Sequence, residues 1–256
     1  MKHPERKPAR ACAHAAEFRF YAELNDFLKP EQRKRTQTYR FNGHPGIKDA
    51  IEAQAVPHTE VDLIVVNGES AGFDYQLRPG DRVAVYPVFE GLDISPIVKL
   101  REKPLRQTAF VVDVNLGRLA RHLRLLGFDT LFSNAYAAPE IVAIAAAQKR
   151  IVLTRDRRLL HAKAVTHGYW VRSVLVAEQV AEVLRRFDLA GQIQPFSRCA
   201  DCNGRIEPVA KEAVLDQLEP KTKKYYSTFY RCPACGKIYW EGSHVGRIRA
   251  RFQALR

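Results

Sequence analysis

The sequence predicts an α/β protein of 256 residues built from three segments, and three observations support this prediction. In residues 14–95, short alternating strand patterns surround one helical stretch, in the order β-β-α-β-β. In residues 106–195, apolar strands alternate with helices, the order that gives a parallel sheet covered on both faces. In residues 196–256, two Cys-x-x-Cys pairs indicate a small metal-bound ribbon.

The elements of the first segment follow from local patterns. Apolar and polar residues alternate in two stretches, one before and one after a loop rich in Lys and Arg. Asn67-Gly68 and Pro79-Gly80 mark turns. We therefore expect strands at 17–22 and 36–41, a helix at 47–55, and further strands at 61–66 and 82–88.

With the phrases FRFYAEL, VDLIVVNG and LRPGDRVAVYPV, this order resembles a ubiquitin-like β-grasp domain of the sulfur-carrier type. Sulfur carriers act through a free carboxy-terminal Gly-Gly, whereas here the last strand runs through Pro87 into another domain. Carrier chemistry is therefore unavailable unless the chain is cut. We expect a docking or scaffold module that a protein partner binds, followed by a linker at 99–104.

The second segment has a different pattern. An apolar face of helical spacing ends at Gly127, a typical residue after a helix, and Pro139 stands in the first turn of the next helix. The expected order is a strand at 110–113, a helix at 116–126, a strand at 128–132, a helix at 139–148, a strand at 151–154, a polar helix from Asp156, a strand at 169–172 and a helix at 176–187.

Acidic residues follow the strands of this segment. Asp113 ends one strand and Asp156 follows another, and the carboxyl ends of parallel strands meet at one edge of a sheet. Glu140, in the first turn of the intervening helix, could reach the same edge. Repulsion between such carboxylates is relieved by a hard divalent cation, so the sequence predicts Mg²⁺ or Mn²⁺ at Asp113 and Asp156. The competing interpretations are a helix cap for Asp156, a salt bridge for Asp113 and a helix-dipole contact for Glu140.

The charge distribution suits a polyanionic partner. Residues 1–105 hold 16 basic and 15 acidic side chains, and residues 106–256 hold 25 and 13, so the second part carries +12 of the net +13. A cation at the acids can activate water for attack on a phosphodiester. The basic residues expected to hold the polyanion beside the acids are Arg118, Arg121, His122, Arg155, Arg157 and Arg158.

The third segment contains four cysteines at zinc-ribbon spacing. Cys199 and Cys202 form one pair, Cys232 and Cys235 the other, and 29 residues separate the pairs. Two such knuckles complete a tetrahedral four-sulfur shell, which leaves no position for water and predicts a structural zinc. A redox disulfide within either pair is the alternative. Strands are expected at 228–231 and 238–241.

The stretches VVDVNLGRLARHLRLLGFDT and RIVLTRD, the two knuckles and YWEGSH together resemble the Mut-seven carboxy-terminal ribonuclease domain over residues 108–250. This is a PIN-like nuclease fold with a zinc ribbon, and some members carry an amino-terminal ubiquitin-like domain. The resemblance implies a metal-dependent ribonuclease acting on RNA, with Asp113 and Asp156 at the acidic positions and Asn115, Thr154 and Arg155 beside them. The sequence departs from the family pattern at one place. The helix that usually opens with Asp-x-Glu in such domains corresponds to residues 138–140 here, where alanine stands in place of the aspartate.

The leading hypothesis is a ribonuclease, and the main alternative is a catalytically inactive adapter that binds RNA through the basic surface and the ribbon. In the ribbon, charge and stacking on RNA are expected from Lys221, Lys223, Lys224, Tyr225 and Tyr226, with a solvated loop as the competing interpretation. No apolar run approaches the length that spans a bilayer, and the start of the chain lacks a secretory pattern, so cytoplasmic localisation is expected.

Overall fold

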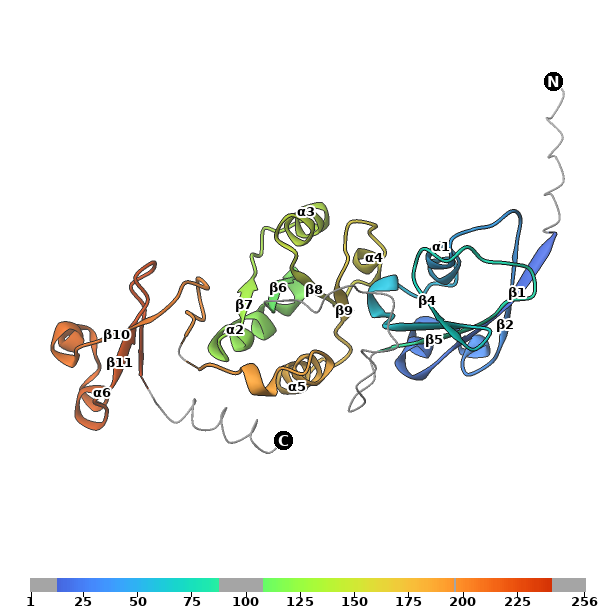
Figure 1. Ribbon diagram of the computed structural model, residues 1–256. Helices are drawn as coiled ribbons and strands as arrows, with labels where there is room; N and C mark the ends of the chain where they lie inside the picture. Colours follow the sequence, from blue (N-terminus) through green and yellow to red (C-terminus); the bar gives the residue numbers. More distant parts are fainter. Residues whose placement is uncertain (1–12, 88–107, 196, 241–256) are drawn as a thin grey trace, which may run out of the picture. The chain divides into compact units, whose positions relative to one another are not determined.

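The computed structural model describes residues 13–87, 108–195 and 197–240 (Figure 1). The chain divides into two compact units, Met1–Pro104 and Leu105–Arg256. The expected linker at 99–104, the segment limits at 95, 106 and 196, and residues 241–256 of the third segment lie outside the described residues. Within the described part, no helix has the length and apolar character needed to cross a bilayer.

The first unit is a five-stranded mixed sheet in the order β2-β1-β5-β3-β4. Its strands are β1 (His14–Phe20), β2 (Gln37–Phe41), β3 (Leu63–Val66), β4 (Glu69–Ala71) and β5 (Arg82–Tyr86). The central neighbours β1 and β5 run parallel, and the other pairs are antiparallel. One helix, α1 (Ile47–Glu52), contributes Ile47, Ala50 and Ile51 to the core.

Short 3-10 turns at Ala22–Phe27, Pro30–Gln32 and His58–Glu60 complete this unit. The arrangement is the β-grasp fold that the sequence predicted. The expected strands and helix are all present, and β4 is the strand that the prediction lacked.

The second unit contains a four-stranded sheet in the order β7-β6-β8-β9, in which all pairs are parallel. Its strands are β6 (Ala109–Val112), β7 (Asp129–Leu131), β8 (Ile151–Thr154) and β9 (Gly168–Trp170). Its helices are α2 (Gly117–Leu125), α3 (Ala138–Gln148), α4 (Arg157–Leu160) and α5 (Val176–Arg186). A 3-10 turn, Val114–Leu116, joins β6 to α2.

Helices cover both faces of this sheet (Figure 1). On one face, α2 and α5 pack Leu119, Leu123 and Val183 against Phe110 of β6. On the other face, α3 and α4 form a second cluster with the strands, made of Val111, Ile141, Ala145, Val152, Leu159, Leu160 and Val165. All four residues of β8 are buried, as expected for a strand between two helical layers. The predicted three-layer architecture is confirmed.

Gly127 ends the α2 segment in the way the sequence predicted. Its φ of 97° lies in the left-handed region, and a Cβ there would stand 2.3 Å from the carbonyl oxygen of Gln194. Any larger residue would be strained and would clash with backbone, so only glycine fits this turn.

The carboxy-terminal part of the unit is a three-stranded antiparallel sheet of β10 (Glu207–Val209), β11 (Phe229–Arg231) and β12 (Ile238–Trp240). Between β10 and β11 lie a 3-10 segment, Lys211–Gln217, and α6 (Pro220–Tyr225). A solvated loop was the competing interpretation of the Lys and Tyr residues at 221–226. The structure shows instead that most of them form this short helix. Pro220 in its first turn and the buried Thr222 account for the difference.

Candidate functional site

The carboxyl ends of β6 and β8 lie side by side. Val112 is paired with Leu153, and the backbone N–H of Asp113 donates to the carbonyl of Leu153 at 3.0 Å. Asp113 therefore leaves the sheet beside Thr154, and Asp156 follows two residues later. Both aspartates stand at one edge of the sheet, because their strands are parallel neighbours.

Asp113 is held by three neutral donors. Its side chain is buried, with the residue 5% exposed. The backbone N–H of Asn115 donates to Oδ1 at 2.6 Å, and that of Arg155 donates to Oδ2 at 3.1 Å. The hydroxyl of Thr154 also donates to Oδ2. A carboxylate has about four acceptor positions, so these donors leave roughly one for another ligand.

Thr154 connects the two acids. Its hydroxyl donates to the Asp113 carboxylate and accepts from the backbone N–H of Asp156 at 2.9 Å. The side chain is fully buried, so water cannot replace either bond. One hydroxyl thus fixes the start of the loop that carries Asp156 relative to the Asp113 carboxylate.

Asp156 caps α4 and pairs with Arg158. The backbone N–H of Arg158 donates to Oδ1 at 3.0 Å, which confirms the helix-cap interpretation of this residue. The guanidinium of Arg158 holds both carboxylate oxygens, with Nη2 2.8 Å from Oδ2 and Nε 3.0 Å from Oδ1. The hydrogen bonds from the Arg158 side chain lower the pKa of Asp156, so its carboxylate stays ionised.

Glu140 lies in the first turn of α3 and is exposed. Among the described residues, only the four cysteines form a group of three or more possible metal ligands with all ligand atoms within 4.8 Å of one another. Asp113, Asp156 and Glu140 therefore do not form a three-carboxylate cluster of this kind. A Mg²⁺ or Mn²⁺ at this edge would therefore have no all-protein cage and would need water or phosphate for most of its ligands.

A surface hollow opens beside Asp156. It is lined by Asn115, Arg155, Asp156, Arg158, Val174 and Gln179. Arg118 is exposed on the first turn of α2, whereas Arg121 pairs with Asp201 of the ribbon at 3.6 Å. The basic side chains expected to act together are therefore divided: Arg155 and Arg158 line the hollow, and Arg121 faces a ribbon carboxylate.

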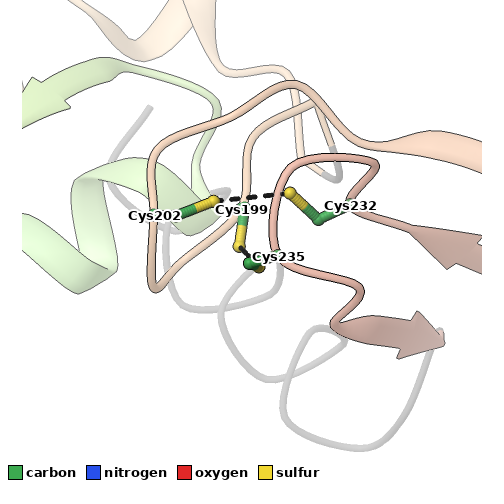
Figure 2. A group of neighbouring side chains, drawn as sticks. All are labelled: Cys199, Cys202, Cys232 and Cys235. Atoms are coloured by element: carbon green, nitrogen blue, oxygen red, sulfur yellow. Dashed lines mark hydrogen bonds between the residues drawn. The ribbon is translucent and has the colours of Figure 1, made fainter.

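The four cysteines converge between the two knuckles (Figure 2). The sulfurs of Cys199 and Cys235 are 3.5 Å apart, those of Cys202 and Cys232 are 3.4 Å apart, and all four thiols are free. Burial raises the pKa of Cys199, but hydrogen bonds from the Cys202 backbone and the Tyr239 hydroxyl outweigh it and bring the pKa to about 6. The pKa of Cys202 is shifted the other way, because burial raises it to about 12. The convergence of the four sulfurs within 4.8 Å of one another is what makes the cluster compatible with a structural zinc.

The first knuckle is bound to the sheet domain by a buried arginine that the sequence prediction missed. The guanidinium of Arg124 on α2 donates to the carbonyl oxygens of Thr130 at 2.7 Å, Ala200 at 3.2 Å and Asp201 at 2.6 Å. Burial lowers the pKa of Arg124, and the charges of Cys199 and Cys202 partly offset this effect. A basic residue inside the apolar spacing of the helix was the signal available in the sequence.

A second contact extends this junction. The side chain of Asn203 accepts from the backbone N–H of Thr130 at 3.0 Å and donates to Asp129 at 2.8 Å. Asp129 also pairs with Arg150 at 2.7 Å and with Arg198 at 3.1 Å. Asn203 of the knuckle thus supplies an acceptor for the backbone of β7 at Thr130.

Comparisons with known proteins agree with this architecture. The family model described as the Mut7-C RNAse domain matches residues 108–252, and the model described as Mut7-C ubiquitin matches residues 13–93. Among curated protein sequences, none matches this chain.

Two solved structures are similar to part of the chain. One is the small archaeal modifier protein 1 of H. volcanii, with 17% identity, coverage of 30% of this chain and 100% of that chain, and a TM-score of 0.24. The other is SAMP1 from Haloferax volcanii, with 20% identity, coverage of 30% and 99%, and a TM-score of 0.25.

Proposed function

Because this chain belongs to the Mut7-C RNAse domain family, we propose that it is a metal-dependent ribonuclease. Hydrolysis of the RNA phosphodiester takes place where Asp113 and Asp156 leave the parallel sheet. The proposal is supported chiefly by two hydrogen bonds of the Thr154 hydroxyl, which donates to the Asp113 carboxylate and accepts from the backbone N–H of Asp156. One buried group therefore positions both acids.

The residues at this edge of the sheet have different roles in the proposed reaction. Asp113 and Asp156 would hold a Mg²⁺ or Mn²⁺, which would supply a Lewis acid for the phosphate and lower the pKa of a water molecule. Asn115 and Arg155 keep the Asp113 carboxylate oriented through their backbone N–H groups. The side chains of Arg118 and Arg158 bind RNA phosphates, since both are exposed at this edge.

Three further assignments belong to the same proposal. Glu140, in the first turn of α3, is assigned as a third carboxylate of the site. The cysteine cluster holds a structural zinc, and Lys223 and Lys224 beside Tyr225 contact RNA away from the acids. The amino-terminal unit docks a protein partner, and the enzyme works in the cytoplasm.

Cleavage of a labelled RNA in Mn²⁺ tests the function, with Asp113→Asn as the variant and Asp188→Asn as the matched control. Asp188 is exposed in the same unit and lies after α5. We expect cleavage by the native protein and the control and none by Asp113→Asn. Equal cleavage by all three proteins would mean a contaminating nuclease.

The second candidate function is an RNA-binding adapter without catalysis. It is favoured by the ion pair between Asp156 and Arg158 and by the exposed position of Glu140. RNA binding without cleavage in Mg²⁺ or Mn²⁺ would support the adapter and contradict the nuclease.

A further inference from the structure

The loop between β9 and α5 displays apolar side chains at the edge where the two aspartates lie. Val174 is 74% exposed and Leu175 is 58% exposed. Val114, next to Asp113, is 42% exposed. Among the described residues, the remaining strongly exposed large apolar side chain is Tyr225 of the ribbon. Three of these four side chains therefore follow strands at the same, carboxyl-terminal edge of one sheet.

Arg155, which follows strand β8, anchors the backbone of this loop to the sheet. The guanidinium of Arg155 donates to the carbonyl of Arg172 at 3.1 Å and also to the carbonyl of Ser173. The same residue donates its backbone N–H to Asp113. Arg155 thus fixes the position of the loop relative to the Asp113 carboxylate.

Helix α5 anchors the loop from the other side. Glu182 accepts from the backbone N–H groups of Arg172 at 2.9 Å and Ser173 at 3.2 Å, and Gln179 donates to the carbonyl of Ser173 at 3.0 Å. The Ser173 hydroxyl accepts from the backbone N–H of Leu175 at 3.1 Å. The loop backbone is therefore fixed before any ligand binds, and a preorganised contact loses little entropy on binding.

The surroundings of Val174 indicate what it contacts. It lines the same hollow as Arg155, Asp156 and Arg158. A ligand that fits there carries negative charge for the arginines and an apolar face for the valine. An unpaired nucleotide has both, a phosphate and the flat face of a base, whereas a duplex keeps its base faces stacked.

We propose that Val174 and Leu175 form the contact for one unpaired base of the RNA, adjacent to the phosphate at Asp113 and Asp156. This inference rests on the proposed RNA substrate. It does not need catalysis, because the loop and the hollow exist without the cleavage step.

Binding of single-stranded oligonucleotides to the full chain tests the contact, by fluorescence anisotropy in buffer without divalent cations. The variant is Val174→Ser with Leu175→Ser, whose exposed positions leave the fold intact. A series of strands, each with a single abasic ribose moved along the sequence, is the partner in a double-mutant cycle. Tyr225→Ser, changed at an equally exposed position in the ribbon, is the control.

The loop variant is expected to bind the intact strand about threefold to tenfold more weakly, at the lower end of what a base contact contributes. When the abasic ribose stands at the position whose base contacts the loop, the loop variant and the native protein are expected to bind equally well. At the same position, any loss of affinity in Tyr225→Ser is expected to remain. An unchanged affinity of the loop variant, or an equal loss with every strand, would overturn the inference and leave the surface to a protein partner. Failure of the nuclease itself would appear differently, as retained RNA binding without cleavage.

Discussion

The guanidinium of Arg158 clamps the carboxylate of Asp156 through two nitrogens, with Nη2 2.8 Å from Oδ2 and Nε 3.0 Å from Oδ1. The arginine side chain is 91% exposed, so this is a surface ion pair. Pairs of this kind contribute about 0–1 kcal/mol. A divalent cation can therefore displace the guanidinium from Asp156 at small cost.

Replacing Arg158 by glutamine is expected to strengthen Mn²⁺ binding about twofold to fivefold, because the cation no longer competes with a pair worth up to about 1 kcal/mol. Isothermal titration calorimetry of the full chain measures the affinity. Arg118→Gln, at an exposed arginine on the neighbouring helix, controls for the loss of one positive charge. Equal gains in both variants would show that net charge alone is responsible.

Thr154→Val removes the hydroxyl that links the two acids while keeping the shape of the side chain. The buried Asp113 carboxylate then lacks one donor and the Asp156 backbone N–H lacks its acceptor, which is expected to destabilise the unit by about 1–3 kcal/mol. Urea denaturation measures this, and cleavage is expected to fall with it. Thr154→Ser keeps the hydroxyl and should retain both properties; if it behaves like valine, the hydroxyl is not the cause.

The ion pairs of Asp129 predict that the free energy of unfolding decreases at acid pH. Burial alone would raise the pKa of Asp129, but hydrogen bonds from Arg150 and Asn203 outweigh burial and lower it below the usual value. Its stabilisation is therefore complete above the unfolded pKa of about 4 and is lost as pH falls through the lower folded pKa. The melting temperatures of the native protein and Asp129→Asn should differ most at neutral pH and converge in acid. A pH-independent difference would contradict this origin.

Removal of the metal should loosen the junction as well as the ribbon. We expect about one zinc ion per chain, lost in Cys202→Ser or on treatment with a chelator. Without a closed knuckle, the carbonyls of Ala200 and Asp201 leave Arg124, so backbone hydrogen exchange should rise at Thr130 and along 199–204. The amino-terminal unit, which carries none of these contacts, is the internal control. Exchange unchanged at Thr130 would mean that the knuckle holds its shape without metal.

The sequence predicted most of the elements because their patterns are local. β8 was expected at the residues where it lies, since a short apolar run bounded by polar residues is typical of a buried parallel strand. β4 and β10 were missed because each has three residues and no clear alternation, and Pro208 further obscures β10. α4 was expected, but its length of four residues depends on packing that periodicity does not report.

The site could be predicted only in part. The edge shared by Asp113 and Asp156 follows from parallel strands, which the alternation of strands and helices indicated. The ion pair of Arg158 with Asp156 and the anchoring of the 172–175 loop by Arg155 depend on side-chain geometry, so no spacing rule could provide them. The same holds for the contacts across the junction, since Arg124 reaches Ala200, 76 residues away along the chain, and Asn203 reaches Thr130, 73 residues away.

The Arg124 junction also has a consequence for the order in which the protein is made. On a ribosome, α2 emerges long before the knuckle at 199–203 has been translated. Until then the Arg124 guanidinium has the Thr130 carbonyl but lacks those of Ala200 and Asp201. A nascent chain arrested before residue 199 therefore lacks two of the three carbonyl acceptors of this guanidinium, and the junction between the sheet and the knuckle forms only after the knuckle has been translated.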